Sequence, residues 1–218
     1  LYLMLKTFFA RHLTPTRLFV MSFILLILLG TLALMLPAAA SHERLSFVDA
    51  FFISASSVCV TGLSTIDIGK DLSLVGQLIT LALFQMGGLG IITFSIILFA
   101  LMGRGISFKG REIAQSAFMH SPSRDFYLII KRVLRYTLVI EGIGIVLLFT
   151  RFVFDFPPRQ ALYHALYNAV SAFNNCGLSL FSDSMTRYQD DIPVNLTIMA
   201  LIILGGIGFI VLHELMDK

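Results

Sequence analysis

The stretches SASSVCVTGLST at residues 54–65 and AVSAFNNCGLSL at residues 169–180 decide the fold of this chain. They align when Gly62 is set on Gly177, an offset of 115 residues, and three further positions are then identical. Each stretch belongs to a segment that begins apolar and turns polar around its glycine. Self-similarity at a fixed offset is the signature of a fold built from copies of one unit. The sequence therefore predicts an internal duplication.

A second pair of motifs supports the duplication. The motif QMGGLGIITF at residues 85–94 aligns with ILGGIGFIVL at residues 203–212, an offset of 118 that is close to the first. The matched glycines are Gly87, Gly88 and Gly90 in the first copy and Gly205, Gly206 and Gly208 in the second. Glycines inside an apolar helix permit bending and close packing, so we expect a hinge or a packing role for them.

The composition is typical of a protein whose main solvent is lipid. Apolar residues make up 57% of the 218 residues and charged residues 13%, and the mean hydropathy is +0.87. A soluble domain cannot cover a water-facing surface with so few charges. A helix needs about 20 apolar residues to cross a bilayer. We predict four crossing helices, at residues 18–36, 72–102, 133–154 and 192–212.

Two shorter segments, at residues 47–66 and 161–182, lie between the paired spans. Only their first 10 to 12 residues look helical, which is too few to cross. Irregular backbone at membrane depth is tolerated only where protein or water covers it, so we expect re-entrant half-helices followed by loops. This topology puts eleven of the sixteen basic residues on one side. Basic residues collect on the cytoplasmic side, which then also holds both ends of this chain.

The predicted fold is an all-α integral membrane protein of two tandem units, each a helix, a re-entrant pore helix and a helix. Because each unit crosses twice, the copies share one orientation and are related by an axis along the membrane normal. We place the first pore unit at residues 1–103 and the second at residues 132–218. A basic cytoplasmic connector at residues 104–131 suits contact with membrane lipid.

The two glycine loops are the candidate functional site. The sequences VTGL at residues 60–63 and NCGL at residues 175–178 follow the half-helices. Backbone carbonyls can replace the hydration shell of a cation, and glycine lets successive carbonyls turn to one axis. The negative carboxyl ends of the half-helices favour a cation there. A single glycine loop is more often a helix break, but its repetition favours an ion filter.

Four motifs in order, SVCVTGLST, QMGGLGIITF, AFNNCGLSLF and GGIGFIVLHEL, resemble those of the Trk and Ktr potassium transporters and their fungal and plant relatives. The resemblance covers nearly the whole chain. It implies potassium uptake through a filter of backbone carbonyls, with K⁺ at Val60, Thr61, Gly62, Asn175, Cys176 and Gly177 and no covalent cofactor. Glycine at the first filter position, where some plant relatives that transport sodium have serine, favours potassium.

The same resemblance implies partners and a location. The family works with a cytoplasmic nucleotide-binding ring, so we expect such a regulatory subunit, a homodimer, and a multi-pass protein of the inner (plasma) membrane. Sodium coupling and the gate stay open. The family carries four pore units in one polypeptide, whereas this chain has two. We expect the amino-terminal half of a longer protein, and the alternative is a pore in which two copies meet.

Other functions compete with potassium uptake. A less selective Na⁺/K⁺ channel and a non-conducting membrane subunit remain alternatives. We predict no enzyme and no catalytic residue, because His213 and Glu214 begin a zinc-protease motif in which Asp217 replaces the second histidine. The net charge of +3 does not favour nucleic acid. Cys59 and Cys176 lack metal-ligand spacing and are expected to be small buried residues.

Three polar residues lie within apolar segments. Glu141 is inside a predicted span and is a functional candidate, with pairing near Arg135 or packing against a neighbouring helix as the alternatives. His164 and Asn168 fall on the second half-helix. We expect them to hold the loop at residues 175–178 from behind by hydrogen bonds.

Overall fold

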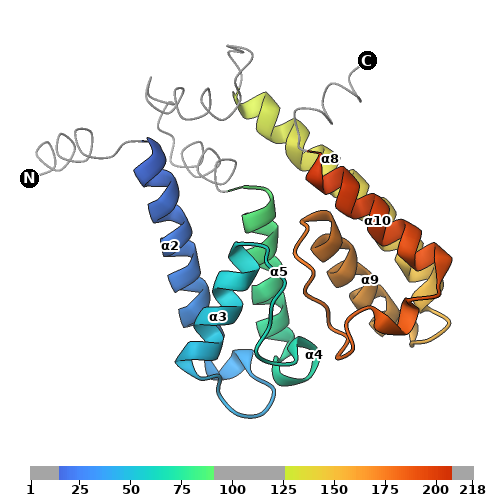
Figure 1. Cartoon of the computed structure of the whole chain (residues 1–218), viewed down its shortest axis with the longest axis horizontal. Helices are drawn as coiled ribbons and strands as arrows, with labels where there is room; N and C mark the ends of the chain where they lie inside the picture. Colours follow the sequence, from blue (N-terminus) through green and yellow to red (C-terminus); the bar gives the residue numbers. More distant parts are fainter. Residues whose placement is uncertain (1–14, 91–125, 208–218) are drawn as a thin grey trace, which may run out of the picture.

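The structure is a computed structural model that describes residues 15–90 and 126–207. Within these ranges the chain forms α-helices, two 3₁₀ turns and no strand, with one isolated bridge between Ala40 and Leu72. The prediction of an all-helical chain is confirmed for the residues described. The helices gather into two groups of three long elements that stand side by side (Figure 1).

The two groups follow each other in the sequence. The first group consists of α2 (Pro15–Leu34), η1 (Pro37–Ala39), α3 (Phe47–Val58), α4 (Ile68–Asp71) and α5 (Leu74–Gly88). The second group consists of α8 (Phe126–Phe152), α9 (Pro158–Phe173), η2 (Thr186–Tyr188) and α10 (Ile192–Gly206). In each group the middle helix, α3 or α9, packs against the helix before it and the helix after it. Helix α8 begins inside the predicted connector, whose residues 104–125 lie outside the described ranges.

Polar side chains fix where several helices begin. The Ser46 hydroxyl accepts from the Asp49 amide at 3.1 Å at the start of α3, and the Ser73 hydroxyl accepts from the Gly76 amide at 3.3 Å at the start of α5. The Asp191 carboxylate accepts from the Val194 amide at 3.1 Å at the start of α10. Such caps satisfy amide groups that have no partner within the helix. Helix α9 instead begins with Pro158, whose fixed φ suits a first turn.

Helix length bears on the four predicted spans. Among the described residues, one helical stretch, Lys131–Phe152, is long and apolar enough to cross a membrane by length and composition. The shorter apolar helices are Val20–Leu34, Phe47–Val58, Leu74–Gly88 and Ile192–Gly206. The predicted spans at 72–102 and 192–212 continue beyond the described residues, at 91–102 and 208–212. The four crossings therefore stay a prediction.

The outer faces of the long helices are apolar and exposed. Helix α2 exposes Leu25 and Leu32, and α8 exposes Leu138 and Ile143, each by more than half of its surface. Water-soluble proteins rarely expose contiguous apolar patches of this kind. These faces fit contact with lipid.

The two groups share a core. Phe84 on α5 packs edge-on against Tyr167 on α9, with ring centroids 5.3 Å apart, and both side chains are fully buried. The Tyr167 hydroxyl and the Thr80 hydroxyl are 2.8 Å apart, so the buried phenol has a hydrogen-bond partner. Cys176 and Leu178 of the second loop belong to the same apolar cluster as α3 and α5. The second loop is therefore held by the first group as well as by its own.

Each segment between two long helices starts and ends at the same end of its group. In the first group, the Ser41 amide donates to the Asp71 carbonyl at 2.8 Å, and the Ser73 amide donates to the Ala39 carbonyl at 3.0 Å. In the second, Arg151 near the end of α8 pairs with Asp191 at the start of α10, with Nε and Oδ2 2.5 Å apart. The chain rises along α3 or α9 and descends through a loop (Figure 1).

Candidate ion-binding loops

The loops that follow α3 and α9 begin with the same three backbone hydrogen bonds. In the first loop, Cys59 N donates to Ala55 O at 2.8 Å, Val60 N to Ser57 O at 3.2 Å and Thr61 N to Ser56 O at 2.9 Å. In the second, Asn174 N donates to Val170 O at 3.0 Å, Asn175 N to Ala172 O at 3.0 Å and Cys176 N to Ser171 O at 2.9 Å. Every donor and acceptor is displaced by 115 residues, the offset found in the sequence.

These bonds set the direction of the carbonyl groups. In a trans peptide the N–H and the preceding C=O point in opposite directions. The Thr61 and Cys176 amides point back into the helices. The Val60 and Asn175 carbonyls, which belong to the same peptide groups, therefore point away from them. The bonds thus leave these carbonyl oxygens facing away from the helix ends.

Left-handed backbone angles also repeat between the loops. Val60 has φ of +50° and Gly62 of +74°, while Asn175 has φ of +58° and Gly177 of +84°. In each loop the residue between these two has a negative φ, so the handedness alternates. Glycine adopts the left-handed conformation without the steric cost that a Cβ brings.

The loops meet at their glycines. A Cβ added to Gly62 would overlap the carbonyl oxygen of Cys176, whereas the nearest atom to a Cβ on Gly177 is the Gly62 Cα, at 3.9 Å. Two loops from different units therefore approach each other at backbone distance. This contact places the candidate residues of the first loop beside those of the second.

Glycines of α5 and α10 pack behind the loops. A Cβ on Gly87 would overlap the Val58 carbonyl oxygen, and one on Gly205 would overlap the Phe173 carbonyl oxygen. Val58 and Phe173 are the last residues of α3 and α9, so the same close packing occurs in both units.

The other four glycines of this motif differ from that pair. The space beside Gly88 is filled by the Asn174 side chain, while a Cβ on Gly206 would only reach ordinary contact with Asn175 Nδ2, at 3.7 Å. Gly90 has φ of +76° and open space around it, and Gly208 lies outside the described residues. A packing role suits Gly87, Gly88 and Gly205, while Gly90 lies where a left-handed bend ends α5.

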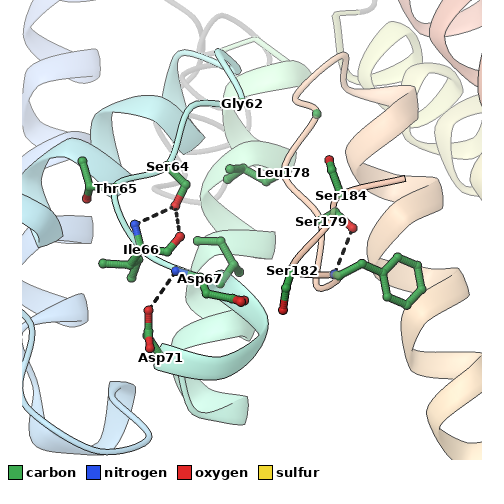
Figure 2. A pocket seen from close by; sticks show the side chains of 13 residues that line it. Gly62, Ser64, Thr65, Ile66, Asp67, Asp71, Leu178, Ser179, Ser182 and Ser184 are labelled. Atoms are coloured by element: carbon green, nitrogen blue, oxygen red, sulfur yellow. Dashed lines mark hydrogen bonds between the residues drawn. The ribbon is translucent and has the colours of Figure 1, made fainter. Parts of the chain in front are cut away.

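A polar cavity of about 480 Å³ opens beside the two glycine loops. It is lined by Gly62, Ser64, Thr65, Asp67, Asp71, Gly177, Ser179, Ser182 and Ser184, among others, and Figure 2 shows that both loops contribute. Burial raises the pKa of the Asp67 carboxyl, but hydrogen bonds from Ser182 and Lys70 outweigh it and leave the pKa below its usual value. The cavity therefore carries a carboxylate in its ionised form near neutral pH.

Several residues behave differently from expectation. Asn168 donates to the His164 carbonyl within α9, at 2.8 Å, and His164 Nδ1 is buried with no hydrogen-bond partner in the described part of the chain. The predicted bonds from these two side chains to the loop are not found there. The Ser171 hydroxyl makes such a bond instead, donating to the Leu178 carbonyl at 2.6 Å.

Ser171 is a residue that the motifs offered and sequence reasoning did not use. Its counterpart Ser56, one of the identical positions in the repeat, accepts at its hydroxyl from the Thr61 hydroxyl at 3.0 Å. Both serines thus stabilise their loops. The expectation that Cys59 is buried is wrong, because the turn after α3 carries it to the surface of the described residues, whereas Cys176 is buried.

Glu141 lies between helices. It is 5% exposed and accepts a hydrogen bond from Gln85 Nε2 on α5 at 2.9 Å. Packing against a neighbouring helix, one of the alternatives for this residue, is therefore the arrangement observed. No group of three or more His, Cys, Asp or Glu side chains suited to a metal ion occurs within residues 15–90 and 126–207.

Comparison with known proteins identifies the family of this chain. Residues 6–217 match the TrkH family, described as cation transport protein. The chain is 36% identical over 205 residues to Ktr system potassium uptake protein B of Bacillus subtilis (strain 168), covering 94% of this chain and 46% of the relative. It is 35% identical over 196 residues to the protein of the same name from Vibrio alginolyticus, covering 87% and 43%.

A third relative is the potassium/sodium uptake protein NtpJ of Enterococcus hirae, 33% identical over 208 residues, which cover 95% of this chain and 46% of that protein. The chain thus spans about half the length of the curated relatives it matches. The family match covers nearly all of the chain, including both glycine loops. This chain belongs to the TrkH family of cation transport proteins.

Proposed function

We propose that this chain supplies two pore units of a potassium uptake protein of the plasma membrane. The ion passes the backbone carbonyls of Val60, Thr61 and Gly62 in one unit and of Asn175, Cys176 and Gly177 in the other. The observation that carries the proposal is the repeated backbone of the two loops, with matched left-handed residues and a close approach at Gly62. Carbonyl oxygens held in this way replace the water shell of K⁺.

The surroundings of the loops favour a cation. The carboxyl ends of α3 and α9 precede the loops, and the partial negative charge of a helix end attracts cations. The polar cavity beside the loops, with the ionised Asp67, forms the entrance through which K⁺ arrives from outside. The ion keeps part of its water among the serine and threonine side chains there. Transport rather than covalent chemistry is the activity.

Partners and assembly follow from the family. Two relatives are named as the B protein of a Ktr system, which implies further subunits of that system. We propose a membrane homodimer with a cytoplasmic nucleotide-binding subunit that gates the pore. Two units close only half of a four-unit ring, so the remaining units come from the rest of a longer polypeptide or from a second copy. The proposal includes coupling of K⁺ uptake to Na⁺.

A less selective Na⁺/K⁺ pathway is the second candidate. It is favoured by the relative whose name includes both ions. Each loop has a single glycine, so it offers fewer ordered carbonyl sites than a longer signature would. Fewer sites weaken the discrimination between two monovalent cations.

Growth of potassium-uptake-deficient bacteria on low potassium tests the function. The chain alone is compared with a version that carries its natural continuation. Rescue only by the longer form supports a half pore, and rescue by the chain alone supports assembly from two copies. If neither form restores growth although both reach the membrane, potassium uptake is the wrong function.

Gly62→Ser then tests the filter in the form that rescues growth. We expect its K⁺ over Na⁺ preference to fall about tenfold, the factor given by about 1.4 kcal/mol. The matched control is Gly142→Ala, because a Cβ on Gly142 meets open space on α8. An unchanged ion preference in Gly62→Ser would count against the carbonyl assignment.

A further inference from the structure

A buried carboxylate links the two units behind the second loop. Glu141 on α8 is 5% exposed, and its partners among the described residues are the amide side chains of Gln85 and Asn174. Gln85 lies on α5 of the first unit, and Asn174 is the residue directly after the end of α9. A buried carboxyl group within an apolar helix of a membrane protein is costly, so it is by default a functional candidate.

The hydrogen bonds run in one direction. The Glu141 Oε1 atom accepts a hydrogen bond from Gln85 Nε2 at 2.9 Å, so the amide nitrogen of Gln85 faces Glu141. Gln85 Oε1 is then free to accept from Asn174 Nδ2, at 2.7 Å. Asn174 Nδ2 also donates to the Val170 carbonyl at 2.8 Å. Glu141 therefore fixes the orientation of both amides, although its direct distance to Asn174 is a longer 3.4 Å.

Asn174 is also seated in a notch of α5. A Cβ on Gly88 would overlap the Oδ1, Cβ and Cγ atoms of Asn174, so the side chain occupies space that only a glycine leaves open. Asn174 directly precedes Asn175, the first candidate residue of the second loop. A displacement of the Asn174 side chain therefore moves the start of that loop relative to α5.

Within the described part of the chain, the positions around the first loop that correspond to this network hold other side chains. At the offset of 115, Cys59 stands in the place of Asn174 and Leu26 in the place of Glu141. At the offset of 118, Ile203 stands in the place of Gln85. These three side chains cannot form an amide and carboxylate chain. The network thus exists once in a duplicated structure, at the boundary between the units.

We infer that Glu141 is a positioning residue for ion selection. Acting through Gln85 and Asn174, it locks the second loop onto α5 of the first unit and so holds the carbonyls of residues 175–177 at the spacing that prefers K⁺. Selection between ions of similar charge depends on the geometry and stiffness of such carbonyls. This inference rests on the proposed function, because it assumes that the loops carry the ion.

The test measures uptake kinetics in whichever form of the transporter rescues growth. Glu141→Leu removes the acceptor, whereas Glu141→Gln keeps an acceptor oxygen for Gln85. We expect Glu141→Leu to raise the apparent KM for K⁺ and to lower the K⁺ over Na⁺ preference, each about tenfold, with a smaller effect on maximal rate. Glu141→Gln should stay within about threefold of the unchanged protein, since the glutamine carbonyl oxygen still accepts from Gln85. Gly88→Ala should resemble Glu141→Leu, because it displaces Asn174.

Thr137→Val is the matched control. Thr137 lies one turn from Glu141 on α8, is 1% exposed, and its hydroxyl has no hydrogen-bond partner among the described residues. Valine has nearly the same size as threonine but lacks the hydroxyl, so the change removes a buried polar group from the same helix. It should leave KM and ion preference unchanged. If Thr137→Val and Glu141→Leu alter ion preference equally, the effect is general packing and the inference fails.

If Glu141→Leu folds poorly, a second variant still tests the inference. Replacing both Gln85 and Glu141 with leucine removes the two polar partners together, which is often close to neutral for stability. We expect normal abundance with an altered ion preference, because Asn174 still loses the hydrogen bond to Gln85 that orients it. Normal abundance with an unchanged preference would overturn the inference. Gly62→Ser separates the two proposals: if it alters selectivity while the Glu141 and Gly88 variants do not, only this inference fails.

Discussion

The two glycine loops have the same backbone but use different side chains to reach it. The first loop places a valine at φ of +50° and the second places an asparagine at φ of +58°. Left-handed angles are tolerated by asparagine and are a marked outlier for a β-branched residue. The three repeated backbone hydrogen bonds and the glycine that follows are common to both loops. The comparison teaches that backbone bonds and glycine set the loop shape, while the side chains set its strain.

The loops also differ in what surrounds them. A Cβ on Gly62 would collide with the second loop, but one on Gly177 would not. Behind the second loop lies the Gln85, Glu141 and Asn174 network, while the position equivalent to Asn174 is the exposed Cys59. The first loop therefore depends on close contact at its glycine, and the second depends on a polar anchor at its start.

The largest expected effect comes from replacing the two loop glycines with alanine, which tests the difference between the loops directly. Gly62→Ala adds a left-handed alanine, which costs about 1–2 kcal/mol, and an overlap with the Cys176 carbonyl that adds about 1–3 kcal/mol. Gly177→Ala adds only the first of these costs. We expect the initial K⁺ uptake rate per membrane protein to fall about tenfold in Gly177→Ala and further in Gly62→Ala, with enough uptake left in both to measure ion preference. Equal losses in both variants would contradict the asymmetric contact.

A smaller effect comes from exchanging the left-handed residues. Val60→Asn gives the first loop the side chain type of the second, so it should relieve strain and stabilise the protein by about 1 kcal/mol. The reverse change, Asn175→Val, should destabilise it by a similar amount. Thermal unfolding of the purified protein in detergent measures both changes. If Val60→Asn lowers the unfolding temperature, the valine is held by packing that outweighs its backbone strain.

Much of this architecture could be predicted from sequence because it is repeated. The offset of 115 predicts the two loops, the helix before each, and the glycines that the structure brings together. The sequence predicts a segment that begins at 161, three residues after the true start of α9, although Pro158 is a helix-start signal. Ser56 and Ser171 were visible as identical positions, but a hydroxyl bond to a nearby carbonyl or hydroxyl leaves no distinct pattern.

The polar network behind the second loop could not be predicted in this way. Its members are separated by 33 to 89 residues in the sequence, and the repeat assigns them Leu26, Cys59 and Ile203 as counterparts. A feature present in one copy only is invisible to self-comparison. The side chain of Glu141 marked it as a candidate, but only the three-dimensional packing of α5, α8 and α9 identifies its partners.

The smallest effect concerns Asp67 and Ser182, which are equivalent positions that meet across the polar cavity. Hydrogen bonds from Ser182 and Lys70 outweigh burial and hold the Asp67 pKa below its ordinary value of 3.8. A carboxylate with a lowered pKa stabilises the folded state above that ordinary value, and the contribution is lost as the pH falls through the lowered one. Asp67→Asn should therefore unfold at a lower temperature than the unchanged protein at neutral pH, by less than about 1 kcal/mol of stability, and this difference should shrink below about pH 4. Ser182→Ala should lower the stability at neutral pH by part of the same amount. Asp190→Asn, at an exposed position, should not lower it. A gap between Asp67→Asn and the unchanged protein that stays constant down to strongly acidic pH would mean that the carboxylate acts by shape rather than by charge.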